Sequence, residues 1–314
     1  MTLAPEIAAL LPAINAQPPM HQRPLAQLRQ PRERIGGAGP VQPVGAVEDR
    51  HIDAGDRTIR VRLYAPPPGT HDAPGAPQAL PLVVLFHGGG FVFGTIEGNY
   101  DHVCRVLCAR AGVRVMSVAY RLSPEHKFPA APDDAWAALQ WAVARAGALG
   151  VDPARVFVAG GSAGGNLAAV TALRARDLGG PALRGQVLFY PVADHPEPAT
   201  GSMREFAEGY YLTAADMRWF WAQYLAREAD RTHPYAAPLR AERLDGLPPA
   251  LVLTAGYDPL RDEAERYAQR LQAAGVAVTM RRYEGMVHGF LAFPTPAADQ
   301  ALQQAADWIG RACR

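Results

Sequence analysis

The stretch RVFVAGGSAGGNLAAVTALRA, residues 155–175, places Ser162 among four glycines, after a valine-rich run and before an alanine-rich one. The first run is typical of a buried strand and the second of a helix. Gly160 and Gly164 bracket the serine in the pattern G-x-S-x-G, and glycine permits a turn that is too tight for larger side chains. The stretch therefore predicts a strained strand-to-helix turn that exposes the serine hydroxyl.

A phosphate-binding loop is the main alternative interpretation of these glycines. Gly160 and Gly165 have the spacing of the two glycines in such a loop, but Asn166 stands where its lysine belongs. A bare G-x-S-x-G pattern also occurs by chance in glycine-rich chains, so its meaning depends on the residues around it. Partners for a nucleophilic serine must therefore be found elsewhere in the sequence.

Short, nearly continuous apolar runs alternate with helix-length segments along most of the chain. Such runs suit strands that are buried on both faces, and their alternation with helices predicts right-handed βαβ units. Expected strands cover residues 82–86, 113–120, 155–160, 186–190, 250–256 and 276–283, after a half-buried strand that starts at residue 59. Expected helices cover residues 100–111, 132–146, 163–178, 260–274 and 297–311. The predicted fold class is α/β, with a mostly parallel central sheet flanked by helices.

Two segments stand outside this alternation. Residues 1–50 mix a short apolar helical pattern with Pro- and Gly-rich sequence, and they hold too little apolar material to form a core alone. Residues 193–247 are rich in Trp, Phe and Tyr, which is typical of a cap over the carboxyl ends of a parallel sheet. We therefore expect an N-terminal segment at 1–50, a cap insertion at 193–247, and one core built from 51–192 and 248–314.

A nucleophilic serine needs a base and an acid that orients the base, and both have candidates downstream. His288 lies in YEGMVHGF after the last expected strand, and Asp258 follows the strand expected at 250–256. The order Ser162, Asp258, His288 is one of the known orders of such a triad. Asp262 and Glu284 are competing acids, but Asp262 falls inside the next expected helix and Glu284 is close in sequence to His288. Asp258 is therefore the preferred acid.

A second glycine cluster, His87-Gly88-Gly89-Gly90, directly follows the apolar run at 82–86. Three glycines in a row offer backbone N–H donors with no side chains to block a substrate oxygen. Together with the N–H of Ala163, at the start of the helix after the serine, they are candidates for an oxyanion hole. We interpret His87 as a buried hydrogen-bonding brace for this loop and not as a second base.

Composition narrows the remaining classes of function. The 314 residues include 31 Lys and Arg against 30 Asp and Glu, so neither nucleic acid nor an anionic membrane is an expected partner. No stretch approaches the roughly 18 apolar residues of a membrane span, and the first residues lack a signal-peptide pattern. Three cysteines, Cys104, Cys108 and Cys313, favour the cytoplasm over a disulfide framework, and the first two are expected to be buried. No spacing predicts a metal site, and no cofactor is expected.

Five motifs together resemble those of the bacterial hormone-sensitive-lipase-like carboxylesterases, also called family IV: HGGGFVFG, VAYRLSPEHKFPAAPDDA, GGSAGGNLAA, DPLRDE and VHGF. The resemblance covers nearly the whole chain. It implies an α/β-hydrolase fold whose helical cap is joined by the N-terminal segment. It also implies that Ser162 is the nucleophile, His288 the general base and then acid, and Asp258 the residue that orients the imidazole. Gly161 departs from the family, which usually has an aspartate before the nucleophile.

The sequence thus predicts a serine carboxylesterase that forms an acyl-enzyme and hydrolyses short- to medium-chain esters of small molecules. An amidase or a lactonase could use the same triad. A ligand-binding protein without catalysis is a further alternative, because one fold can host unrelated functions. The last expected strand, near residues 276–283, could lie at a sheet edge and pair with a second copy in a homodimer.

Overall fold

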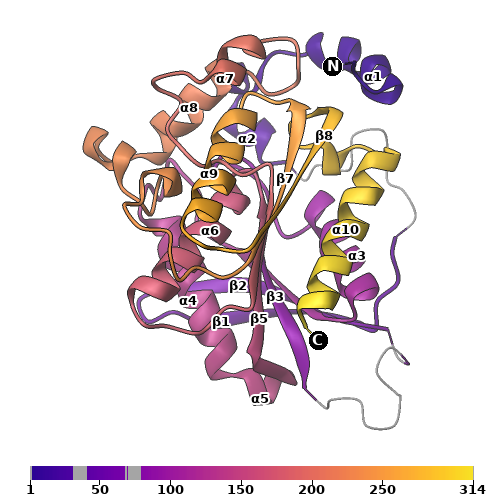
Figure 1. Cartoon of the computed structure of the whole chain (residues 1–314), viewed down its shortest axis with the longest axis vertical. Coiled ribbons are helices and arrows are strands. Elements are labelled where there is room, and N and C mark those ends of the chain that lie inside the picture. The colour runs from indigo at the N-terminus through magenta and orange to yellow at the C-terminus, as the bar shows by residue number, and fades with distance from the viewer. Residues whose placement is uncertain (1, 31–40, 68, 70–78, 314) are drawn as a thin grey trace.

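One eight-stranded sheet forms the centre of the computed structural model, which describes residues 2–30, 41–67, 69 and 79–313 (Figure 1). The strands are β1 (Ala46–Asp53), β2 (Thr58–Ala65), β3 (Leu80–Phe86), β4 (Arg114–Ala119), β5 (Val151–Gly161), β6 (Gly185–Phe189), β7 (Ala250–Tyr257) and β8 (Val278–Val287). Their order across the sheet is β1-β2-β4-β3-β5-β6-β7-β8. β2 is antiparallel to both β1 and β4, and all pairings from β4 to β8 are parallel. The prediction of an α/β fold with a mostly parallel sheet is confirmed.

Helices cover both faces of this sheet. On one face α3 (Asn99–Ala111) and α10 (Pro296–Ala312) lie side by side, and on the other lie α4 (Ala130–Ala144), α6 (Ala163–Asp177) and α9 (Arg261–Ala273) (Figure 1). The short helix α5 (Ala146–Leu149) leads into β5. Each of the five helices predicted from the sequence is present, with ends that differ from the expected ones by a few residues.

Strand β3 is apolar at nearly every position and does not alternate apolar with polar residues, because both of its faces are buried. Leu82, Val84 and Phe86 belong to the core beneath α4 and α6, whereas Val83 and Leu85 belong to the core beneath α3 and α10. All five side chains are essentially inaccessible to solvent. Burial of one such side chain stabilises the fold by about 1.5–3 kcal/mol. The strand must therefore be apolar on both faces.

Strand β1 was not predicted, and it starts at Ala46, inside the segment expected to precede the core. Its sequence AVEDRHID is mostly polar, and only Ile52 is buried. β1 is an edge strand held by antiparallel pairing with β2, so hydrophobic periodicity gives little sign of it. Residues 31–40 of the expected N-terminal segment lie outside the described residues.

The aromatic insertion between β6 and β7 forms four short elements: α7 (Gly201–Glu205), α8 (Ala214–Tyr224), η2 (Glu228–Thr232) and η3 (Pro238–Arg240). Beside it lie α1 (Pro5–Asn15), η1 (Met20–Gln22) and α2 (Leu25–Leu28), near the carboxyl ends of the strands (Figure 1). His21 joins the two parts, because its backbone N–H and its Nδ1 both contact the buried carboxylate of Asp216, at 2.8 and 2.9 Å. Asp216 also accepts a hydrogen bond from the N–H of Thr213, the N-cap of α8.

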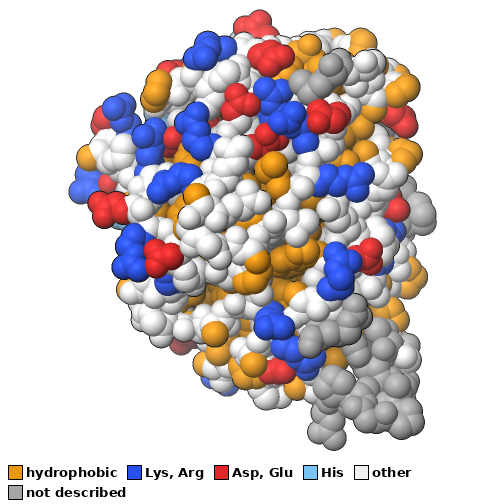
Figure 2. Space-filling model, viewed as in Figure 1, with side chains coloured by type: hydrophobic (Ala, Val, Ile, Leu, Met, Phe, Trp, Pro, Cys, Tyr) orange, Lys and Arg blue, Asp and Glu red, His pale blue; other side chains and the backbone are white. Residues whose placement is uncertain are grey.

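The surface carries charges of both signs. Figure 2 shows basic and acidic side chains intermixed over one face, with no large area of a single sign. Many of the charges pair locally, as Arg243 does with Asp245 at 2.6 Å. None of the helices in the described part of the chain is both long enough and apolar enough to cross a membrane.

Candidate active site

Four loops meet at the carboxyl edge of the sheet, and each brings one of the residues singled out from the sequence. His87 directly follows β3, Ser162 follows β5, Asp258 follows β7 and His288 follows the last residue of β8. Ligands of open parallel sheets bind at this edge. η4 (Phe290–Ala292) comes after His288 and precedes α10. The topology therefore gathers side chains that lie up to two hundred residues apart.

Ser162 lies at the turn between β5 and α6, in a backbone conformation that non-glycine residues rarely adopt, with φ 58° and ψ −121°. The turn is compact because its flanking residues have no side chains. A methyl group at Gly160 would collide with the carbonyl of Gly164, and one at Gly164 would collide with the carbonyl of Phe86. The strained turn predicted from G-x-S-x-G is thus present, and it exposes the serine hydroxyl to a cavity.

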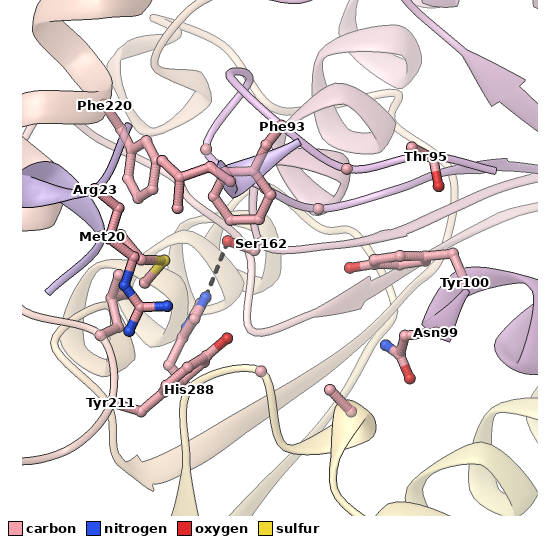
Figure 3. A pocket seen from close by; sticks show the side chains of 18 of the residues that line it. Met20, Arg23, Phe93, Thr95, Asn99, Tyr100, Ser162, Tyr211, Phe220 and His288 are labelled. Atoms are coloured by element: carbon pink, nitrogen blue, oxygen red, sulfur yellow. Dashed lines mark hydrogen bonds between the residues drawn. The ribbon is translucent and has the colours of Figure 1, made fainter. Parts of the chain in front are cut away.

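The structure brings Ser162, His288 and Asp258 into one hydrogen-bonded chain. His288 Nδ1 lies 2.8 Å from Asp258 Oδ2, and His288 Nε2 lies 2.9 Å from Ser162 Oγ (Figure 3 shows the second contact). A carboxylate only accepts hydrogen bonds, so Nδ1 carries the proton and Nε2 is free to accept one from the serine. Asp258 is 1% exposed, and its other oxygen accepts a hydrogen bond from the N–H of Leu260. The ring of Tyr190 packs edge-on against the imidazole.

The two competing acids contact other groups. Asp262 lies on α9 and accepts a hydrogen bond from the N–H of Ser202, at 2.7 Å. Glu284 lies on β8 with a side chain that is 58% exposed, and it faces Arg282. Neither carboxylate has a hydrogen bond to His288, so Asp258 is the acid that the structure places beside the imidazole.

The loop after β3 has the geometry needed to present backbone donors. Gly89 and Gly90 have φ values of 126° and 60°, which favour glycine. The carbonyl of Gly89 accepts hydrogen bonds from the N–H groups of Val92 and Phe93, which closes the loop. Gly88, Gly89 and Gly90 all line the same cavity as Ser162.

His87 supports this loop from beneath. Its Nδ1 donates a hydrogen bond to the carbonyl of Gly88 at 2.9 Å, and its ring stacks on that of Tyr120 at 4.2 Å between centroids. Tyr120 in turn donates its hydroxyl hydrogen to the carbonyl of His87. Burial lowers the pKa of His87 to about 4, so its ring is neutral at pH 7.

The α6 end of the site adds a further donor. Helix α6 begins at Ala163, and the first N–H groups of a helix have no partner within it. The positive end of the helix dipole favours negative charge at the same point. The N–H of Ala163 is therefore suited to an oxyanion that forms at a carbon attached to Ser162 Oγ.

Gly161 occupies a position where a side chain would press against two tyrosines. A methyl group there would lie 2.7 Å from the hydroxyl of Tyr100 and 3.1 Å from the ring of Tyr190. The hydroxyl of Tyr100 donates a hydrogen bond to the carbonyl of Gly161, at 3.3 Å. The absence of the family's usual aspartate thus goes together with two tyrosines packed around this glycine.

The site opens into a cavity of about 470 Å³. Ser162 lies between two unlike ends of it, as Figure 3 shows. One end is walled by the N-terminal segment and the insertion, through Met20, Leu28, Leu212 and Phe220. The other end is lined by Thr95, Asn99 and Tyr100. A bound molecule that reaches Ser162 can therefore extend in two chemically different directions.

Sequence reasoning missed two kinds of residue in this site. Nothing in PPMHQRP marked Met20 and Arg23 as cavity walls, because their placement depends on long-range packing. Glu263 was part of the motif DPLRDE, but its role was not seen. It is 1% exposed, and its Oε1 accepts hydrogen bonds from the N–H groups of Ala193 and Asp194. Burial raises its pKa to about 8.

The arrangement is suited to acyl transfer. It combines a serine hydroxyl, an imidazole hydrogen-bonded to it, a buried carboxylate and backbone N–H groups that line the same cavity. In the part of the chain that the structure describes, no three His, Cys, Asp or Glu side chains gather as a metal site.

Known proteins are similar to the chain over most of its length. The α/β hydrolase fold family matches residues 83–292. A carboxylic ester hydrolase of Mycobacterium tuberculosis is 46% identical over 71% of this chain, which spans 61% of that relative. An esterase of the same organism is 44% identical over 84% of this chain and 82% of its own length. A hyperthermophilic esterase from the archaeon Pyrobaculum calidifontis is 40% identical, with a TM-score of 0.87 and 99% of each chain covered.

Proposed function

We propose, on the premise that the chain belongs to the hormone-sensitive-lipase-like family of α/β hydrolases and is a carboxylesterase, that Ser162, His288 and Asp258 form its catalytic triad. The observation that carries the proposal is the unbroken hydrogen-bonded chain from Ser162 Oγ through the imidazole to the buried carboxylate. Ser162 Oγ faces the cavity, His288 Nε2 is placed to accept its proton, and the buried Asp258 holds the other side of the imidazole.

In the first step, Ser162 Oγ attacks the carbonyl carbon of an ester while its proton passes to His288 Nε2. Asp258 stabilises the imidazolium that forms, through its contact with Nδ1. Negative charge develops on the carbonyl oxygen, and we assign the N–H of Ala163 and N–H groups of Gly88–Gly90 to receive it. Removal of one such donor typically costs about 10²- to 10³-fold in rate.

In the second step, the tetrahedral intermediate collapses and the alcohol leaves with the proton from His288. The acyl group is then bonded to Ser162 Oγ. Water gives a proton to His288 Nε2 and attacks the same carbonyl carbon. The bond from that carbon to Ser162 Oγ then breaks, His288 returns the proton to Oγ, and the carboxylic acid is released.

Short- to medium-chain esters are the substrates we propose. A cavity of about 470 Å³, walled by the N-terminal segment and the insertion, supports a small molecule enclosed near Ser162. A series of 4-nitrophenyl esters from acetate to palmitate measures this preference. We expect kcat/KM to be highest between about four and eight acyl carbons, and a maximum at palmitate would contradict the proposal.

The decisive experiment for the triad combines an active-site label with one substitution. We expect an organophosphate ester to add one phosphoryl group to the wild type, detected by intact-protein mass, and none to Ser162→Ala. The variant should also lose kcat for 4-nitrophenyl butyrate by roughly 10⁶-fold. A folded wild type with neither adduct nor turnover would instead favour the ligand-binding alternative. Relative rates on matched amides and lactones distinguish the amidase and lactonase alternatives.

We also propose that residues 2–30 and 193–247 act together as the cap, with the core in 46–192 and 248–313, because the strand β1 moves the expected boundary at residue 50 back to Ala46. The contact of His21 with Asp216 supports this, and limited proteolysis within the cap should alter KM before it unfolds the core.

The edge position of β8 supports a homodimer, which light scattering tests directly. We place the enzyme in the cytoplasm because its three cysteines form no disulfide, and cell fractionation tests this.

A further inference from the structure

Arg23 is a charged side chain inside the substrate cavity that the proposed reaction does not use. It follows η1 and lines the cavity that holds Ser162. Its Nε donates a hydrogen bond to the carbonyl of Pro18 at 2.6 Å. This contact fixes one edge of the guanidinium, which lies beside Met20 at the wall of the cavity (Figure 3).

Among the described residues, the charge of Arg23 has no carboxylate partner, because no Asp or Glu oxygen lies within 4.0 Å of its nitrogens. Glu97, the carboxylate that lines the same cavity, is paired with Arg60 and lies 3.5 Å from Arg62. The described lining of the cavity therefore contains a carboxylate, Glu97, that is paired with arginines, and a guanidinium, Arg23, that has no carboxylate partner.

Arg23 also stands where the substrate cavity meets a second one. The neighbouring cavity, of about 390 Å³, is formed by the N-terminal segment and the start of the insertion. Arg23, Met20 and Tyr211 line both cavities. Met20, Phe220 and Arg23 lie on the same side of Ser162 in the cavity, so a substituent directed to that side meets both apolar side chains and the guanidinium (Figure 3).

From this arrangement we propose that the enzyme favours esters that carry a carboxylate on the substituent directed toward Arg23. The inference rests on the proposed function and specifies its substrate class, which would be monoesters of dicarboxylic acids or hydroxy acids acylated on their hydroxyl group. A guanidinium binds a carboxylate with two parallel N–H···O bonds, which fixes both distance and orientation. Thr95, Asn99 and Tyr100, at the opposite end, have no positive charge to offer such a group.

Two substrate pairs test the proposal, because an acyl or an alcohol substituent could occupy the Arg23 end. The acyl pair is mono-4-nitrophenyl adipate against 4-nitrophenyl heptanoate, and the alcohol pair is 4-acetoxybenzoate against 4-methylphenyl acetate. For each pair the ratio of kcat/KM, charged over neutral, is compared between the wild type and Arg23→Met. We expect one of the two ratios to fall about 3- to 20-fold in the variant, mainly through KM.

A matched control removes an arginine of the insertion that does not line the cavity. Arg218 lies on α8 with a side chain that is 52% exposed, so Arg218→Met should leave both ratios unchanged. Arg23→Lys keeps the charge without the planar fork and should retain part of the preference. It also provides a second test if Arg23→Met does not fold.

The proposal is overturned if neither ratio changes by more than about twofold in Arg23→Met and Arg23→Lys, since such a change is within the range of a solvated surface charge. Failure of the underlying esterase function has a different signature. In that case the wild type itself would not turn over the neutral esters, or Ser162→Ala would turn them over as fast as the wild type, whatever the effect of Arg23. The two outcomes are therefore read from separate variants.

Discussion

Replacement of Glu263 by glutamine should change how the stability of the enzyme depends on pH. The carboxyl of Glu263 is enclosed between α9 and the loop after β6, and its Oε1 accepts two backbone hydrogen bonds. Burial, and to a smaller extent the nearby Asp194 and Asp258, raises its pKa from 4.5 to about 8. Glutamine keeps an oxygen at Oε1 for the two N–H groups but cannot ionise.

The sign of the effect follows from proton binding. Between pH 4.5 and about 8 the unfolded chain has lost the proton of Glu263 while the folded chain keeps it, so the wild type becomes less stable as pH rises. Below pH 4.5 both states are protonated, and above about 8 both are ionised. Each pKa unit corresponds to about 1.4 kcal/mol, so the full rise corresponds to about 5 kcal/mol, of which about 4 kcal/mol falls between pH 5 and 8.

Urea denaturation at intervals from pH 5 to 8.5 measures this difference. We expect the free energy of unfolding of Glu263→Gln to exceed that of the wild type by an amount that grows with pH, by about 4 kcal/mol over the range. Glu284→Gln is the control, because that side chain is 58% exposed and should leave the pH dependence unchanged. Wild-type and Glu263→Gln curves that run parallel across the range would refute the reasoning.

Two further predictions concern packing. Gly164→Ala should destabilise the fold by about 3 kcal/mol or more, because a methyl group collides with the carbonyl of Phe86, whereas Gly147→Ala meets open space and should cost nothing measurable. Urea denaturation of both variants checks this, and a loss below about 1 kcal/mol for Gly164→Ala would contradict it. Ellman's reagent should react with one thiol of the native protein, the half-exposed Cys313. The two buried cysteines of α3, whose thiol pKa values are raised by burial, should react only after denaturation, and fast reaction of all three would contradict their burial.

The core of the fold could be predicted from sequence because strands that are buried on both faces of the sheet are continuous apolar runs. Apolar runs such as the one at 82–86 indicated the parallel strands, and the residues after them indicated the loops that meet in space. Ser162, Asp258 and His288 were found by this route, since each follows a strand that could be recognised. β1 was missed because its pairing uses backbone groups, and its side chains are mostly polar and solvent-exposed.

The surroundings of the proposed triad depend on contacts between residues far apart in the sequence. Met20 and Arg23 are cavity walls because the N-terminal segment docks on the rest of the chain, through contacts that include those of His21 with Asp216 and of Asn15 with Gly209. The unusual Gly161 could be read from the sequence, but the two tyrosines packed around it could not. Long-range packing therefore decides the shape of the cavity, while local sequence decides its chemistry.

One part of the cavity wall comes from a different stretch of the chain than the residues proposed to react within it. Met20, Arg23 and Leu28 lie within the first thirty residues, whereas the proposed triad lies between residues 162 and 288. Directed evolution of substrate scope can therefore vary this short N-terminal part of the wall while the proposed triad stays constant. The same feature affects laboratory handling: trimming these residues, or crowding them with a fusion partner, would give an enzyme with a different range of esters. An affinity tag is better joined after α10.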